Sequence, residues 1–429
     1  MFYEKIEKAL KFAKKLGVEN IEIWVEHDKI NELSWRENRE IVNTTDFTGV
    51  GIRVIIGKKQ GKFSFTGIGE NMLKHGIRIA YKIAKLSKPD HFFPGLPEKY
   101  EKSNVKCLYD KKIEEMNLEK IKDIKNSIID ITKMEIPKGN IKTICSEIFL
   151  FSFNQEINEK ITTLSAEARL KCGEKSFRKT FSSRTFEKFL KDVETFSKRT
   201  QLLKNFKNPK PVKSGKWDIV LLPEIAGSVF MKMLVEQLYA DAVQKGKSAF
   251  EETEIAIAKE NLTLIDSGII PHRVGSRAFD GDGLKTRETI LIEKGVLKSF
   301  LHNYYTAHIE EVETTGNSYR KYNSLPEVKA NNIILKEGDI DIEELNNCIF
   351  VYKIIGSKLS NPTQGIMSFN IAFGFIKTDQ ELIPVSGGIV YDDFFDIIKN
   401  RIEICKNQEW HENLCFPPIL MKNVNIIGK

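Results

Sequence analysis

The first half of the chain alternates between two hydrophobic periods. Between residues 4 and 16 apolar positions recur every three or four residues, which predicts an amphipathic helix that Gly17 ends. Residues 21–27, IEIWVEH, alternate apolar and charged side chains, which is typical of a half-buried strand. A strand hairpin follows, with its tight turn at 57–61. The same reasoning predicts helices at 70–86, 118–133 and 185–206, and a strand meander at 141–183.

The second half predicts few helices among many strands. Residues 217–223, WDIVLLP, are a short apolar run that indicates a buried strand. The helix predicted next, over 224–243, has apolar residues on nearly every side, so we expect it to lie in a core. A hairpin is predicted at 288–303, with its turn at Lys294 and Gly295. The remaining predicted elements are strands within 348–356, 366–390 and 417–428, and a late helix at 393–407.

A polar segment near the middle of the chain predicts a domain boundary. Residues 207–217, KNPKPVKSGKW, contain two prolines, a glycine and four lysines, a composition typical of a linker. A length of 429 residues also exceeds one typical domain. We therefore predict two domains, residues 1–210 and 211–429. The fold class is α+β: a mixed N-terminal domain and a strand-rich C-terminal domain with a central buried helix.

Charge, hydropathy and cysteine content limit which classes of function fit the chain. The net charge is +7, from 66 basic and 59 acidic residues, and most lysines alternate with glutamates as on solvated helix faces. This pattern argues against nucleic-acid binding. No apolar run approaches the roughly 20 residues that span a bilayer, and the acidic residues of the N-terminal helix argue against a signal or transit peptide. Six cysteines without any C-x-x-C spacing indicate reduced thiols, so we expect a cytoplasmic protein.

Common catalytic motifs are absent from the sequence. It contains no P-loop, no G-x-S-x-G, no H-E-x-x-H and no EF-hand loop. Residues His411, Glu412 and Cys415 are the one short segment that gathers residue types used by zinc. Such a His-x-x-x-Cys beside a proline pair is more often incidental. We therefore assign no metal ligand there and keep a non-standard metal site as an alternative hypothesis.

Four segments of the chain resemble the TldD/PmbA family. Residues 279–320 contain an acidic-Gly turn (FDGDG), a hairpin with a Gly turn, a Tyr-Thr-Ala helix start, and a Thr-Gly-Asn before an arginine. Residues 48–67, 241–250 and 361–376 match three other family segments in the same order. Because the four motifs are collinear and span most of the chain, the resemblance is specific.

The resemblance also shows which motif the predicted central helix lacks, the metal-binding motif of the family's peptidases. TldD-type members are zinc peptidases with His-Glu-x-x-x-His on this helix, whereas PmbA-type members, also called TldE, lack the motif and pair with a TldD subunit. Alignment backwards from KGKSAF (245–250) places the three positions on Met231, Lys232 and Glu236. None matches, so no catalytic and no metal-binding residue is carried over. Lys232 and Glu236, four residues apart, are instead candidates for an ion pair.

The resemblance therefore implies a PmbA/TldE-like subunit of a TldD–TldE-type zinc metallopeptidase. It implies a heterodimer in which a TldD-like partner binds zinc and this chain binds no cofactor. The expected substrate is an unfolded or small peptide, and the sequence identifies no substrate-binding residue. Two alternatives stay open: a self-sufficient metallopeptidase with a non-standard metal site, and a protein that binds and modulates DNA gyrase.

Overall fold

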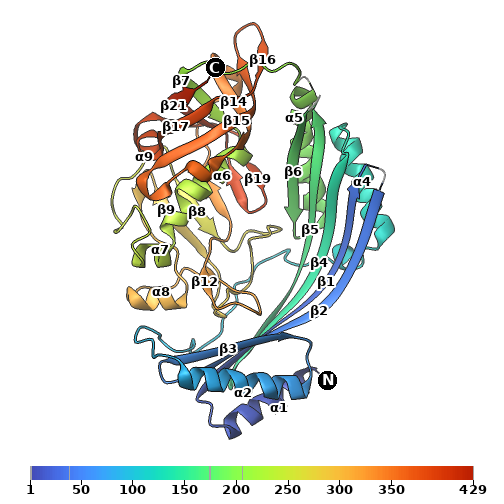
Figure 1. Ribbon diagram of the computed structural model, residues 1–429, viewed down its shortest axis with the longest axis vertical. Coiled ribbons are helices and arrows are strands. Elements are labelled where there is room, and N and C mark those ends of the chain that lie inside the picture. The colour runs from blue at the N-terminus through green and yellow to red at the C-terminus, as the bar shows by residue number, and fades with distance from the viewer. Residues whose placement is uncertain (1, 38, 173–174, 205, 429) are drawn as a thin grey trace.

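The computed structural model describes residues 2–37, 39–172, 175–204 and 206–428. The fold is mixed α+β, as predicted: an antiparallel sheet region forms the N-terminal half, and the C-terminal half is rich in strands (Figure 1). No helix within these ranges is long and apolar enough to cross a membrane.

The N-terminal half is built on one six-stranded antiparallel sheet. Its strands follow the order β3-β2-β1-β4-β5-β6, and the two halves of the sheet carry different helices (Figure 1). Helices α1 and α2 cover one end, and α4 and α5 cover the other. The short helix α3 lies against β4 and β5. The strands are β1 (Asn20–Arg36), β2 (Arg39–Ile56), β3 (Lys59–Thr66), β4 (Lys138–Phe151), β5 (Glu156–Cys172) and β6 (Lys175–Ser183). The helices are α1 (Phe2–Lys15), α2 (Glu70–Leu86), α3 (Lys111–Glu114), α4 (Leu118–Thr132) and α5 (Phe186–Lys204).

The C-terminal half combines a small barrel with a second sheet. Strands β14, β7, β21, β17 and β15 are hydrogen-bonded in that order, and β15 also pairs with β14, which closes the ring. The barrel strands are β7 (Gly215–Leu221), β14 (Cys348–Ile355), β15 (Ile366–Lys377), β17 (Ile389–Asp393) and β21 (Ile419–Ile427), with β16 (Leu382–Val385) and β18 (Ile402–Ile404) beside them. The second sheet has the order β10-β9-β8-β13-β20-β19. Its strands are β8 (Leu264–Ser267), β9 (Glu288–Glu293), β10 (Val296–Leu297), β13 (Ile333–Leu335), β19 (Glu409–His411) and β20 (Leu414–Phe416).

The predicted central helix is buried but not continuous. Helix α6 (Pro223–Met233) packs between the barrel and β19–β20, and Gly227 permits the close approach, since a Cβ there would lie 3.2 Å from side-chain atoms of Leu414. At Leu234 the backbone leaves the helical region, with φ −124° and ψ −58°. A 3₁₀ turn, η1 (Val235–Leu238), and the short helix α7 (Ala240–Gln244) follow. This segment carries apolar residues on nearly every side, and the bend at Leu234 allows Val235 and Leu238 to enter the core.

The predicted late helix at 393–407 is wrong in its second half. The structure has a single turn, α9 (Phe394–Asp396), then a π-helical turn (Ile397–Arg401), and then strand β18. Ile402 and Ile404 are both buried, and their strand pairs with β21. An alternating apolar triplet that finds an open strand edge gains ladder hydrogen bonds that a frayed helix end lacks.

The two halves share hydrophobic cores. Phe206 stacks on Phe373 of β15 with ring centroids 3.6 Å apart, within a cluster that joins α4 and α5 to the barrel. A second shared cluster brings Trp24 of β1 against Phe279. The boundary predicted at residue 210 falls between α5 and β7. It remains a prediction.

Candidate functional site

The three positions aligned with the family's metal motif lie at the end of α6 and in η1. Met231 is partly buried and packs against the C-terminal core. The Lys232 ammonium donates to the backbone carbonyl of Ser357, which begins the 3₁₀ turn η3 (Ser357–Leu359). Glu236 is exposed on η1. Met231 and Lys232 therefore each make contacts within the fold, whereas Glu236 is exposed.

The predicted ion pair between Lys232 and Glu236 does not form within the described ranges of the chain. Pairing of residues four apart requires a continuous α-helix, and α6 ends at Met233 before Glu236 is reached. Although the Glu236 side chain is exposed, desolvation by the atoms around it raises the pKa of its carboxyl, and the charge of Lys232 partly opposes this. Lys232 therefore acts on Glu236 only as a nearby charge.

Zinc does not fit this donor set. Zinc sites in proteins use thiolate, imidazole and carboxylate ligands, usually three or four of them. Met231 offers a thioether, the Lys232 ammonium is already a donor to Ser357, and Glu236 alone offers a carboxylate. Across the part of the chain that the structure describes, no three His, Cys, Asp or Glu side chains are grouped as a metal site.

The alternative cluster of His411, Glu412 and Cys415 is not brought together either. His411 pairs with Leu414 and Trp410 pairs with Cys415 across the β19–β20 ladder. Directly paired residues point to the same face of a sheet and consecutive residues to opposite faces, so His411 and Cys415 point apart. Burial lowers the pKa of His411 to about 4, and burial raises that of the Cys415 thiol to about 12.

His411 instead meets the beginning of α6. Its Nε2 lies 3.6 Å from Oε1 of Glu224, and Glu224 also pairs with Lys179 of β6 at 2.7 Å. On the other face of the ladder, Arg273 stacks on Trp410 with its guanidinium carbon 4.0 Å from the ring centroid. These contacts attach β19 to its neighbours and give His411 and Trp410 structural roles.

The acidic-Gly turn of the family-like motif binds backbone amides. Asp280 is buried, and its carboxylate accepts from the amides of Leu284 and Ser318 at 3.0 and 3.2 Å. Burial and the nearby Asp282 raise the pKa of Asp280 to about 8. Ser318 belongs to the segment that follows the Thr-Gly-Asn, so the two parts of the motif are joined directly. Their role here is to fix one loop against another.

A second buried carboxylate holds the Thr-Gly-Asn segment from the other side. Asp266 of β8 accepts from the Asn317 side chain at 2.7 Å and from the Asn331 amide at 2.6 Å. Complete burial raises the pKa of Asp266 to about 7, and these hydrogen bonds oppose that rise. A carboxyl of this kind takes up its proton near neutral pH.

The arginine that ends the motif crosses to the N-terminal sheet. Arg320 and Arg53 of β2 both pair with Oε2 of Glu22, at 2.9 and 2.6 Å. Arg320 also lies 4.5 Å from the ring centroid of Trp24. Burial raises the pKa of Glu22, and the two arginines more than offset this, so that it lies below its usual value.

Sequence reasoning missed this buried ion pair network. Alternation in IEIWVEH predicted a half-buried strand, whereas both faces of β1 are buried there and Glu22 lies inside. The available signal was an arginine inside the apolar run of β2, two residues after a Gly-x-Gly. A charged residue in such a run usually has a partner when the strand is buried.

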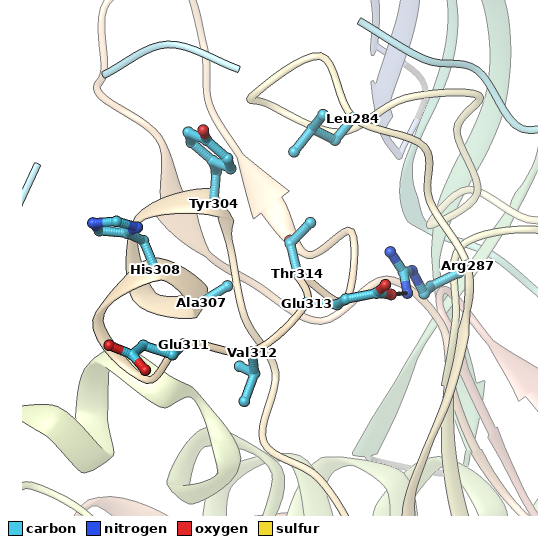
Figure 2. Close-up of a pocket in the computed structure, with 9 residues that line it drawn as sticks. All are labelled: Leu284, Arg287, Tyr304, Ala307, His308, Glu311, Val312, Glu313 and Thr314. Carbon is cyan, nitrogen blue, oxygen red and sulfur yellow. Dashed lines mark hydrogen bonds and ion pairs between the residues drawn. The ribbon is translucent and has the colours of Figure 1, made fainter. Parts of the chain in front are cut away.

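A surface cavity of about 410 Å³ lies beside the short helix α8 (Tyr304–Ile309). Figure 2 shows Tyr304 and His308 projecting from the helix and Glu313 turned toward Arg287, with which it pairs at 2.9 Å. Figure 2 also shows the carboxylate of Glu311 well apart from that pair. The charged groups therefore do not converge on one point, and this cavity does not have the geometry of an acid–base site.

Comparison with known proteins identifies the class. A profile for the PmbA/TldA metallopeptidase C-terminal domain matches residues 214–428, half of the chain. The chain therefore belongs to the PmbA/TldD metallopeptidase family.

Individual relatives cover nearly the whole chain. An uncharacterised protein of Methanocaldococcus jannaschii is 28% identical over 425 residues, which is 97% of this chain and 98% of that protein. A metalloprotease of the same organism is 26% identical over 408 residues, which is 89% of this chain and 87% of that protein. The crystal structure of TldE from Thermococcus kodakarensis has a TM-score of 0.86 at 22% identity and covers 99% of this chain and 100% of that one. The last comparison shows that the fold is TldE-like.

Proposed function

We propose that this chain is a TldE-type subunit that acts with a TldD-type metallopeptidase subunit. The partner binds zinc and supplies the general base, and the substrate is an unfolded or small peptide. The observation that carries the proposal is the side-chain set at 231, 232 and 236. A thioether, an ammonium engaged with Ser357 and one exposed carboxylate stand where family peptidases have their metal motif.

Two further features support the proposal. The likeness in fold to TldE from Thermococcus kodakarensis covers 99% of this chain and 100% of that one. The six cysteines are unpaired, which supports the expected reducing compartment, the cytoplasm. The alternative of a self-sufficient metallopeptidase at His411 and Cys415 is disfavoured, because these side chains point to opposite faces of the β19–β20 ladder.

Metal analysis of the purified chain tests the proposal. The chain alone should contain far less than one zinc per molecule, because neither candidate segment offers three converging ligands. Elemental analysis after dialysis against zinc gives the ratio, and a Met231→His/Lys232→Glu/Glu236→His variant is the matched comparison. Stoichiometric zinc in the natural chain that is lost in His411→Ala or Cys415→Ala would contradict the proposal and favour the alternative.

A further inference from the structure

A crevice of about 630 Å³ lies between α5 and the C-terminal barrel. Its apolar wall consists of three nearly buried rings, Phe350 and Tyr352 from β14 and Phe375 from β15. Leu222, just before α6, extends this wall, and Leu382 of β16 lies at the margin with 43% of its surface exposed. The size falls within the range of cavities that bind small molecules, and the aromatic wall suits an apolar group.

The polar groups of the crevice carry both signs of charge. Two ammonium groups line it: Lys198 of α5, which is exposed, and Lys377 of β15, whose side chain is 21% exposed. Two carboxylates line it as well, Glu343 and Glu409. The Glu343 side chain is 88% exposed, so the Lys377 side chain is the less exposed of that pair. An ammonium beside aromatic rings favours a ligand that places a carboxylate there and an apolar group against the rings.

The ammonium of Lys377 is held in place by its neighbours. It donates to the backbone carbonyl of Glu343 and lies 3.9 Å from that residue's carboxylate. It also lies 6.0 Å from the ring centroid of Phe350. A fixed ammonium loses little conformational freedom when it binds an anion, so recognition of a carboxylate at this point costs little ordering entropy.

We propose that this crevice binds a short apolar peptide with free termini. The C-terminal carboxylate pairs with Lys377, the apolar side chain of the last residue lies against Phe350, Tyr352 and Phe375, and the peptide's amino group faces the carboxylates. This site belongs to the chain itself and goes beyond the proposed function, because binding requires no partner subunit. Since α5 and the barrel both line the crevice, the peptide also bridges the two halves of the molecule.

Calorimetric titration of the chain alone tests this proposal with three peptides. Ala-Leu-Phe should bind saturably, and its C-terminal amide should bind about tenfold more weakly, because it lacks the charge that meets Lys377. Triglycine, which has both termini and no apolar side chain, should show no saturable binding. These comparisons use the unaltered protein, so they do not depend on whether a variant folds.

Two variants locate the site. Lys377→Met should weaken Ala-Leu-Phe about tenfold and abolish the preference for the acid over the amide. The matched control Lys399→Met, an exposed lysine on the π-helical turn, should bind like the unaltered chain. The proposal is overturned if Ala-Leu-Phe does not bind at millimolar concentration, if its amide or triglycine binds as tightly, or if Lys377→Met binds as the unaltered chain does. These results do not bear on activation of a partner peptidase, which is measured separately.

Discussion

Single residues explain why a family-like motif persists in a chain without the metal ligands. Asp266, Asp280 and Arg320 all belong to or contact the segment around the Thr-Gly-Asn, and all three are buried with defined partners. Buried charged and polar groups cost free energy unless they are paired or hydrogen-bonded. The motif thus has a structural role in this chain that is independent of catalysis.

Removal of Arg320 should destabilise the protein strongly. Arg320→Ala deletes one of the two partners of Glu22 and the contact with Trp24, so we expect a loss of roughly 3 kcal/mol in the free energy of unfolding. Urea unfolding followed by tryptophan fluorescence measures this loss. Arg287→Ala is the control, because its pair with the 86% exposed Glu313 should contribute less than about 1 kcal/mol. Equal effects of the two substitutions would contradict the assigned importance of the buried network.

Asp266 should make stability depend on pH. Its folded pKa of about 7 lies above the ordinary value near 3.8, so between these values the folded state binds the extra proton. Stability from this group is therefore present below about pH 4 and is lost as pH rises toward 7, at up to about 1.4 kcal/mol per pH unit. Asp266→Asn should remove this slope, although it also replaces an acceptor of Asn317 with an amide. The difference in unfolding free energy between the two proteins, measured from pH 4.5 to 8, gives the result, and a constant difference would refute the assignment.

Most elements were predictable because local pattern and tertiary environment agree. The predicted helix at 70–86 coincides with α2, where a single apolar stripe packs on the sheet. Two of the segments that differ lie in the C-terminal core, where apolar residues on nearly all sides give no preferred face. There α6 ends at Met233, and residues 402–404 form a strand, because packing between the barrel and the second sheet decides the conformation.

For the candidate site, the residue types could be predicted from the sequence, whereas their geometry could not. The identities of Met231, Lys232 and Glu236 were readable from alignment and already argued against zinc. Their contacts could not be predicted in this way, since the hydrogen bond from Lys232 to the Ser357 carbonyl joins residues 125 positions apart. Likewise, the separation of His411 from Cys415 depends on strand register, which the sequence of six residues does not specify.

Strand β18 should contribute core packing at a position where the sequence predicted a helix. Ile402→Ala should lower the free energy of unfolding by about 2–5 kcal/mol, because Ile402 is fully buried beside β21. Lys399→Ala, on the preceding turn and exposed, should change it by less than about 0.5 kcal/mol. Thermal unfolding of both variants provides the comparison. A loss below 1 kcal/mol for Ile402→Ala would show that this strand is not packed as described.

For the whole molecule, the shared cores indicate that the two halves act as one body. Clusters around Phe206 and Phe373 and around Trp24 and Phe279 join residues on either side of position 210. We propose that the division at residue 210 separates two structural domains whose stability is coupled through these contacts. A partner subunit that binds this chain would then contact one preassembled surface.

Reconstitution with a TldD-type subunit tests the central claim most directly. Each chain alone and the mixture of both are assayed on an unfolded peptide, with and without a chelator, and the mixture is also examined by size-exclusion chromatography. The account predicts no cleavage by this chain alone, a defined hetero-oligomer in the mixture, and cleavage by the mixture that exceeds that of the partner alone and stops with the chelator. Glu236→Gln in this chain should leave the mixture's activity within a few-fold. Chelator-sensitive cleavage by this chain alone, or a mixture no more active than the partner alone, would contradict the account.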